Sequence, residues 1–228
     1  MLIDNLPIAE RNIITVVIPT LNKSDPKLFN ITLNELNNSR LVDEVLIVDN
    51  SVDKGFKDMA WEKVRHIKDQ PNLWVNGAWN WGVAQAKTPY VLLLNDDVIL
   101  DKSVLVECVN AIAEYDCIVI DTGKEGLSEY MVNVPRHNKK VNVIDCKLAH
   151  EGSFILVKRE KYVIIPAELK IFFGDYWLFE RMRLGKVLST YVNHLGQTTV
   201  NKENRYDDGT LAREREIYQQ LGGANGKS

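Results

Sequence analysis

The sequence has few cysteines and no long apolar run, and both absences exclude classes of protein. Its 228 residues contain three cysteines, an odd number at wide spacing. They therefore form neither a disulfide framework nor a zinc pattern, and we interpret them as reduced and structural. No uninterrupted apolar stretch approaches the roughly 18 residues that a membrane-spanning helix requires. Residues 1–12 carry acids and a proline instead of the apolar core of a signal peptide, so we expect a cytoplasmic protein without a transmembrane segment.

The sequence also lacks a strong charge of either sign. Its formal net charge of -3 gives no overall attraction to nucleic acid or anionic membranes. A hydrophobic content of 45% and a charged content of 26% are ordinary for a globular protein. The length suits one domain, and no repeat or linker divides the chain, so we expect a single domain over residues 1–228.

Strands and helices alternate over the first half of the chain. Apolar, β-branched runs predict buried strands at 13–18, 44–48, 64–67 and 90–94. Helical spacing predicts helices at 26–37, 57–63, 76–87 and 103–115. This order predicts a right-handed parallel sheet, which is a Rossmann-like nucleotide-binding half over about residues 1–116.

The pattern changes after about residue 117. Shorter runs at 117–120, 130–134, 140–146 and 152–157 predict a mixed, partly antiparallel half that extends to about residue 200. A helix that begins near Asp175 is expected to include Leu184, and a further strand is expected at 187–192. An amphipathic helix over 207–221 would be followed by a frayed tail from Gly222. The fold class is therefore α/β.

Polar clusters follow three of the predicted strands. Asn95, Asp96 and Asp97 follow the strand at 90–94, while Pro19 and Asp49 begin the clusters after two others. Ligands bind at this edge of an open α/β sheet, so we expect the clusters to converge. Adjacent carboxylates repel unless they are solvated, hydrogen-bonded or neutralised by a cation. A hard divalent ion that also binds a diphosphate would suit them.

Several motifs in the same order resemble family 2 glycosyltransferases, in particular their rhamnosyltransferase-like branch. They are Val-Val-Ile-Pro-Thr-Leu-Asn at 16–22, Leu-Ile-Val-Asp-Asn-Ser at 46–51, Asn-Gly-Ala-Trp-Asn-Trp-Gly at 76–82, Leu-Leu-Asn-Asp-Asp-Val at 93–98, Phe-Phe-Gly-Asp-Tyr-Trp-Leu-Phe-Glu-Arg at 172–181 and His-Leu-Gly at 194–196. The resemblance implies the A-type glycosyltransferase fold. It also implies metal-dependent, inverting transfer of a sugar from a nucleoside diphosphate, of UDP or dTDP type, to a glycan or another hydroxyl-bearing acceptor.

The resemblance also implies residue roles. Asp175 would be the general base, Asp97 would bind Mn²⁺ or Mg²⁺, and His194 would complete the metal shell or contact the diphosphate. The residues implied to bind the nucleotide sugar are Pro19, Thr20, Asn22, Asp49, Asn50, Asn76, Gly77, Asn80, Asn95 and Asp96. Those implied on the acceptor side are Gly152, Ser153 and Trp177, and core packing explains Trp177 equally well.

Two departures from the family pattern and three alternatives accompany this interpretation. Asn95 stands where an aspartate often begins the metal motif, and Gly174 stands where a glutamate often precedes the base. A nucleotidyltransferase would carry a glycine-rich basic loop, but residues 19–24 contain no glycine. A catalytically silent nucleotide-sugar-binding protein is a second alternative. The third is a DNA glycosyltransferase acting on hydroxymethylated bases, which would need residues 136–140 and 158–161 to form one positive groove beside the site.

Overall fold

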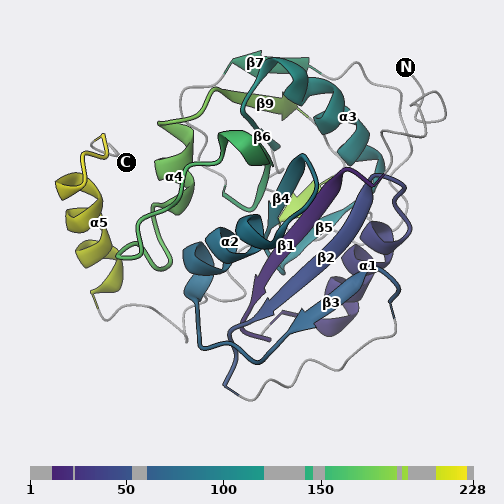
Figure 1. Ribbon diagram of the computed structural model, residues 1–228, viewed down its shortest axis with the longest axis horizontal. Coiled ribbons are helices and arrows are strands. Elements are labelled where there is room, and N and C mark those ends of the chain that lie inside the picture. The colour runs from purple at the N-terminus through teal and green to yellow at the C-terminus, as the bar shows by residue number, and fades with distance from the viewer. Residues whose placement is uncertain are drawn as a thin grey trace.

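The computed structural model describes residues 12–22, 24–52, 61–120, 142–145, 152–188, 192–194 and 209–224 (Figure 1). The helices are α1 (Pro26–Asn37), α2 (Trp74–Gln85), α3 (Ser103–Ala111), α4 (Gly174–Phe179) and α5 (Thr210–Gln220). The strands are β1 (Ile14–Thr20), β2 (Val42–Asp49), β3 (Val64–Ile67), β4 (Tyr90–Leu94), β5 (Val98–Leu100), β6 (Cys117–Ile120), β7 (Asn142–Asp145), β8 (Phe154–Lys158), β9 (Leu184–Leu188) and β10 (Val192–His194). Short 3-10 helices lie at Ile112–Glu114 and Arg159–Lys161.

One mixed sheet of eight strands forms the centre of the molecule, in the order β3-β2-β1-β4-β8-β6-β9-β7. Strands β3, β2, β1 and β4 are parallel, as predicted for the first half. Strand β8 runs antiparallel to both β4 and β6. Strands β5 and β10 form a separate antiparallel pair. The predicted α/β class, with a parallel half and a mixed half, is confirmed.

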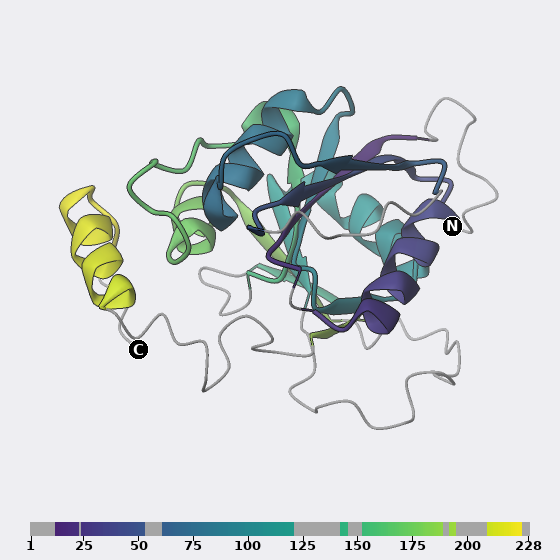
Figure 2. The same ribbon diagram turned by 90° about the horizontal axis from the view of Figure 1, so that it is seen from below.

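Helices cover both faces of the sheet (Figure 2). Side chains of α1 and α3, such as Leu33 and Leu105, pack on one face, whereas α2 and α4 contribute Trp79 and Leu178 to the other. Trp79 is buried in the core. Because both faces of the sheet are covered, its central strands are apolar throughout rather than alternating.

Helix α2 lies very close to β1. A Cβ atom placed on Gly82 would overlap the side chain of Val17. A glycine at this position therefore lets the helix axis approach the strand. The amino-terminal end of α2 lies at the same sheet edge as the carboxyl ends of the strands.

Two predicted elements are wrong in their extent. Helix α4 has six residues and ends at Phe179, and Leu184, which we expected on this helix, begins β9. The longer helix was predicted because Met182 is an apolar residue at helical spacing. Met182 is indeed buried, but it lies in a turn after the helix has ended. The single strand predicted at 187–192 is instead the end of β9 and the start of β10. Strand β5 was not predicted, and the strand predicted at 130–134 and most of the helix predicted at 57–63 lie outside the described residues.

The chain beyond α5 is held against the protein through Ala224, contrary to the predicted fraying from Gly222. Gly222 has φ +83°, a left-handed conformation that ends the helix and turns the chain back. Gly223 then lies on the ring of Tyr218, and the backbone N–H of Ala224 donates to Glu180 at 3.0 Å.

Two of the cysteines, Cys108 and Cys117, are buried and free, which confirms their prediction as reduced; Cys146 lies outside the described residues. Burial raises the pKa of the Cys117 thiol to about 12. Within the described part of the chain, no helix combines the length and apolar character needed to span a membrane.

Candidate active site

The carboxyl ends of β1, β2 and β4 meet at one edge of the sheet. Thr20 is paired in register with Asp49, and the backbone N–H of Asn50 donates to the Thr20 carbonyl oxygen at 2.8 Å. The Thr20 hydroxyl donates to Asp96 Oδ2 at 2.5 Å. The predicted convergence of the three polar clusters is therefore confirmed.

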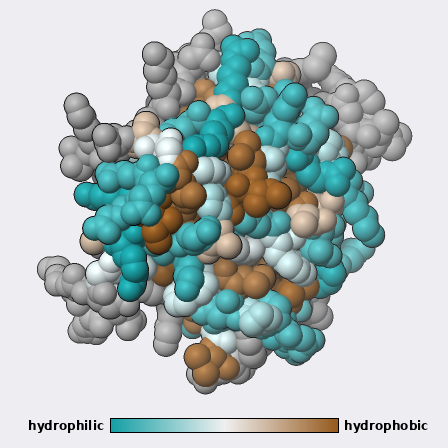
Figure 3. Space-filling view, turned by 60° about the vertical axis from the view of Figure 1, so that its left-hand side comes forward, coloured by the Kyte–Doolittle hydropathy of each residue, from teal (hydrophilic) through white to brown (hydrophobic). Residues whose placement is uncertain are grey.

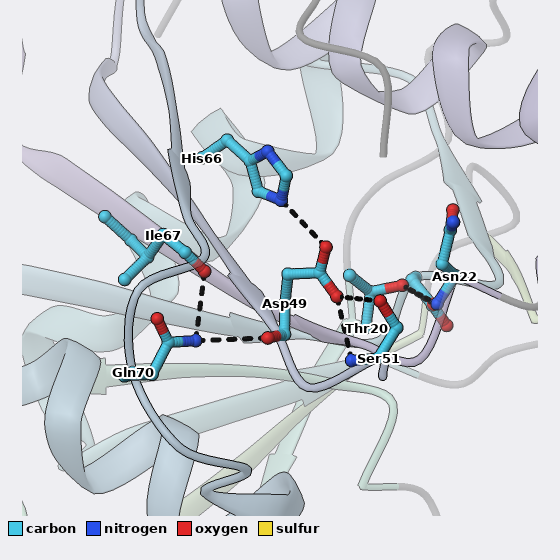
Figure 4. A network of polar contacts seen from close by, with 8 residues as sticks. Thr20, Asn22, Asp49, Ser51, His66, Ile67 and Gln70 are labelled. Atoms are coloured by element: carbon cyan, nitrogen blue, oxygen red, sulfur yellow. Dashed lines mark hydrogen bonds and ion pairs between the residues drawn. The ribbon is translucent and has the colours of Figure 1, made fainter. Parts of the chain in front are cut away.

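Asp49 is held at the centre of a hydrogen-bond network (Figure 4). Its Oδ1 accepts hydrogen bonds from the backbone N–H of Ser51 at 2.8 Å and from the Ser51 hydroxyl at 2.5 Å. Its Oδ2 lies 2.9 Å from Nε2 of His66 on β3. Burial raises the pKa of Asp49, but the hydrogen bonds from Ser51 and the interactions with His66 outweigh burial and lower it below its ordinary value. The carboxylate is thus ionised and fixed in orientation.

Sequence analysis did not identify Ser51 or His66 as part of this site. Ser51 follows Asp49 by two residues, a spacing at which an aspartate often accepts a hydrogen bond from the backbone. That spacing was an available signal for Ser51. His66 reaches the carboxylate only because β3 pairs with β2, and nothing in its local sequence indicates this.

Three asparagines implied to bind the nucleotide hold the polypeptide through their side chains. Asn50 accepts a hydrogen bond from the Leu73 N–H at 2.9 Å and donates to the Trp74 carbonyl at 2.9 Å, which fixes the start of α2. Asn80 accepts a hydrogen bond from the Tyr162 hydroxyl at 2.9 Å and donates to the Ile165 carbonyl at 2.8 Å.

The third asparagine, Asn76, binds the segment that precedes α4. Its Nδ2 donates to the carbonyl oxygens of Leu169 at 3.1 Å and Phe172 at 3.2 Å, and its backbone N–H donates to Lys170 at 3.0 Å. A Cβ atom placed on Gly174 would overlap the Asn76 carboxamide. Asn76 thus positions the approach to Asp175 from the α2 side.

Asp96 and Asp97 are both buried in the turn between β4 and β5. Burial raises the pKa of Asp96 to about 6, and the neighbouring Asp97 carboxylate adds to this rise, while hydrogen bonds from Thr20 and Ser24 oppose it. Strand β10 pairs with β5 so that His194 lies opposite Val98, the residue that follows Asp97. The backbone of His194 is therefore beside the acidic turn.

Asp175 lies on the other side of this turn. A Cβ atom placed on Gly152 would lie 2.5 Å from Asp175 Oδ2, so the carboxylate packs directly on this glycine. The next residue, Ser153, accepts a hydrogen bond from the Asn95 N–H at 3.0 Å through its carbonyl oxygen. Gly152 and Ser153 therefore connect Asp175 to the end of β4. Asp175 lies in the first turn of α4, as predicted.

The remaining predicted residues lie around this edge. Pro19 is a buried residue of β1, and Asn22 has a left-handed backbone, with φ 59°, from which its N–H donates to Thr20. Gly77 has only ordinary contacts on the protein side: a Cβ atom there would lie 3.6 Å from Leu73. Trp177 is half-buried, donates to the Ile164 carbonyl at 3.2 Å and carries the Arg181 guanidinium 3.3 Å above its ring.

One of the two basic segments that a DNA acceptor would require, residues 158–161, does not lie beside the site. Lys158 pairs with Tyr90, the first residue of β4, whereas Asn95 follows the last residue of that strand. Residues 158–161 are therefore at the opposite edge of the sheet, about 16 Å from Asn95 along β4. Residues 136–140 lie outside the described part of the chain.

The arrangement suits transfer chemistry at an activated sugar. It joins a fixed carboxylate at the end of β2, a buried acidic pair after β4 and a third acid at the start of a helix. A family described as glycosyl transferase family 2 matches residues 15–187. The chain belongs to this family. The protein is therefore a glycosyltransferase.

Known structures show the same fold. The family 2 glycosyltransferase described here superposes on residues 1–349 of S. aureus TarS with a TM-score of 0.59 and 18% identity, covering 93% of this chain and 73% of that one. The complex of that fragment with UDP-GlcNAc gives a TM-score of 0.61 at 17% identity, covering 93% and 67%. GalNAc-T7, solved with UDP, GalNAc and Mn²⁺, gives 0.61 at 14% identity, covering 81% and 43%. A search of the curated proteins found no significant match. The A-type glycosyltransferase fold is thus shown.

Proposed function

We propose that this glycosyltransferase moves a sugar from a nucleoside diphosphate to an acceptor hydroxyl with inversion, and that Asp175 is the general base. The observation that carries the proposal is the contact of Asp175 with Gly152, next to the strand-end cluster of Asn95 and Asp96. A base must reach the attacking hydroxyl on the face opposite the leaving group. Asp175 on the α4 side and a diphosphate bound on the β4 side would lie on opposite faces of the sugar, as this requirement demands.

The donor is a uridine or thymidine diphosphate sugar in this proposal. The structures of TarS with UDP and with UDP-GlcNAc support it. Thr20 and Asn22 would lie beside the nucleotide, and the open surface at Gly77 would let the backbone approach it.

A divalent cation, Mn²⁺ or Mg²⁺, would be held by Asp97 and His194. The donor set fits because these ions bind one or two protein ligands and complete their shells with phosphate oxygens and water. When bound, the ion stabilises the negative charge of the departing diphosphate. Asp96, held by Thr20, would orient the neighbouring backbone.

The acceptor is a glycan or another hydroxyl-bearing molecule, and Ser153 and Trp177 would lie on the acceptor side of the site. The position of residues 158–161 at the far edge of the sheet does not favour DNA.

A donor screen tests these assignments. Thermal unfolding would be measured with UDP-, dTDP- and GDP-sugars, each with Mn²⁺ or with EDTA. We expect stabilisation by uridine or thymidine diphosphate sugars only when Mn²⁺ is present, because a ligand that binds the native state raises its stability. Release of nucleoside diphosphate, with an inverted product by NMR, would support transfer. Donor binding without release of nucleoside diphosphate would contradict the proposed transfer reaction, and stabilisation in EDTA equal to that in Mn²⁺ would contradict the metal assignment.

A further inference from the structure

Helix α5 is polar along most of its length, yet it buries two side chains four residues apart. Glu214 is 3% exposed and Tyr218 is 1% exposed, while most of their neighbours on the helix are exposed. Residues at this spacing lie on the same helix face. A carboxylate is rarely buried unless it has strong partners, so the contacts of Glu214 show what this face binds.

Glu214 binds the segment that leads to Asp175. Its Oε2 accepts hydrogen bonds from the backbone N–H of Ile171 at 3.1 Å and of Phe172 at 2.8 Å. Hydrogen bonds from backbone N–H groups to a carboxylate are stronger than those between neutral groups. A residue about forty positions away therefore fixes two consecutive peptide groups just before the proposed base.

Tyr218 holds the next residue of this segment. Its ring stacks on Phe173, with centroids 5.1 Å apart and an angle of 20° between the planes. Phe173 has a left-handed backbone, with φ 61°, which is unfavourable for a bulky residue. Such a conformation persists only where surrounding contacts impose it. The stack with Tyr218 is one such contact.

The same segment is held from the opposite side by α2. Asn76 donates to the carbonyl oxygens of Leu169 and Phe172, so Phe172 is bound through its N–H by Glu214 and through its carbonyl by Asn76. Figure 1 shows α5 beside α4, away from the central sheet. Figure 3 turns this side toward the viewer and shows polar side chains around separate apolar patches. Helix α5 contacts the segment before α4 through Glu214 and Tyr218, and Tyr218 also contacts Trp177 on α4.

We propose that Glu214 is a positioning residue for Asp175, and that α5 belongs to the catalytic apparatus. This inference rests on the proposed role of Asp175. Glu214 touches no reacting group; it acts by fixing residues 171–173, which set the direction from which α4 begins.

Four variants of the full chain test this inference. Glu214→Ala removes both hydrogen bonds, whereas Glu214→Gln keeps an acceptor oxygen of the same reach. Glu216→Ala is the matched control, because Glu216 is an exposed glutamate on the same helix. Asp175→Asn reports separately on the proposed base.

The first readout is amide hydrogen exchange in a peptide that covers residues 170–174. Exchange should be about tenfold or more faster in Glu214→Ala than in wild type or Glu216→Ala. The second readout is turnover with the donor that the wild type uses, beside the dissociation constant of UDP with Mn²⁺. We expect kcat to fall about 10- to 100-fold in Glu214→Ala, with the UDP dissociation constant within about twofold of wild type.

Glu214→Gln should keep slow exchange and most of the wild-type kcat. If the Glu214→Ala variant does not fold, the comparison of Glu214→Gln with wild type still tests the inference. Exchange and kcat in Glu214→Ala equal to those of Glu216→Ala would overturn the inference. A folded glutamine variant with as large a loss of kcat as the alanine variant would also overturn it. If Asp175→Asn keeps full turnover, the proposed base is wrong, whatever Glu214 does.

Discussion

Gly174 illustrates how one residue is fixed by its surroundings. The related family pattern often has a glutamate immediately before the base, but a side chain at this position would overlap the carboxamide of Asn76. Asn76 occupies that space because it binds the carbonyl oxygens of Leu169 and Phe172. The departure from the pattern noted in the sequence therefore has a structural explanation, although the sequence alone could not provide it.

The Gly174→Ala substitution should displace the segment before α4. Overpacking of a buried site costs about 1–3 kcal/mol, so we expect a loss of this size in the free energy of unfolding. Because the shift occurs next to Asp175, kcat should fall more than the affinity for nucleotide. Urea unfolding and steady-state kinetics measure the two effects. Unchanged stability and kcat would show that Asn76 moves without consequence.

The Gly77→Ala substitution should have the opposite effect on stability. A Cβ atom at Gly77 meets only Leu73, at an ordinary 3.6 Å, and a helical alanine lowers the entropy of the unfolded chain. We expect a gain of about 0.4–1 kcal/mol in the free energy of unfolding. Nucleotide affinity should fall, because the added methyl group occupies the surface that we assign to the nucleotide. A more stable variant with unchanged affinity for UDP and Mn²⁺ would remove Gly77 from the binding surface.

The buried Asp96 should make stability depend on pH. Its folded-state pKa of about 6 lies above the value of 3.8 for an unperturbed aspartate. The folded state therefore binds this proton more tightly, and the resulting stabilisation is complete below pH 3.8 and lost as the pH rises through about 6. The difference corresponds to at most about 3 kcal/mol.

Denaturant unfolding in EDTA between pH 4 and pH 7 measures this effect against Asp96→Asn. The wild type should lose stability relative to the variant across that range. If the free energies of unfolding of the two proteins changed with pH in the same way, the elevated pKa of Asp96 would be contradicted.

At the scale of elements, α2 connects the parts of the site. Gly82 sets its distance from β1, Asn50 fixes its start, and Asn76 and Asn80 bind two segments of the second half. The resemblance implied nucleotide-binding roles for the three asparagines. Their observed side-chain partners are backbone groups far away in sequence, which periodicity and local motifs do not reveal.

The Gly82→Ala substitution tests the close packing of α2. The added methyl group would overlap Val17 in the core, so we expect the free energy of unfolding to fall by about 1–3 kcal/mol. The change at Gly77, on the same helix, serves as the control because it has room. Equal stability of the two alanine variants, measured by urea unfolding, would show that the helix shifts without cost.

The sequence predicted strands and helices well where apolar residues repeat regularly. The continuous apolar runs of β1 and β4 and the helical spacing of α1 were recognisable in this way. Prediction failed at α4 and at β5. Met182 is buried at a helical spacing although the helix has already ended, and the three residues of β5 are too few for a periodic signal.

At the scale of the whole molecule, the sheet topology decides which residues lie close together. Three parallel strand ends and the turn at Gly152 bring Asp49, Asp96 and Asp175 to one edge, as the order of motifs indicated. The same topology separates Lys158 from that edge, because β8 runs antiparallel to β4. The short apolar runs predicted a partly antiparallel second half, but not which of its strands would be antiparallel to β4. The position of residues 158–161, which the DNA alternative needs beside the site, could therefore not be predicted, whereas the convergence of the strand ends could.

The most direct test of the central claim is the Asp175→Asn variant, assayed for donor binding and for transfer. An asparagine keeps the size of the side chain but cannot accept the acceptor's proton. General-base catalysis contributes about 10²- to 10⁴-fold, so kcat should fall by that factor. The dissociation constant for UDP with Mn²⁺ should stay within about twofold of wild type. Retained turnover in a folded Asp175→Asn protein would contradict the assignment of Asp175 as the base.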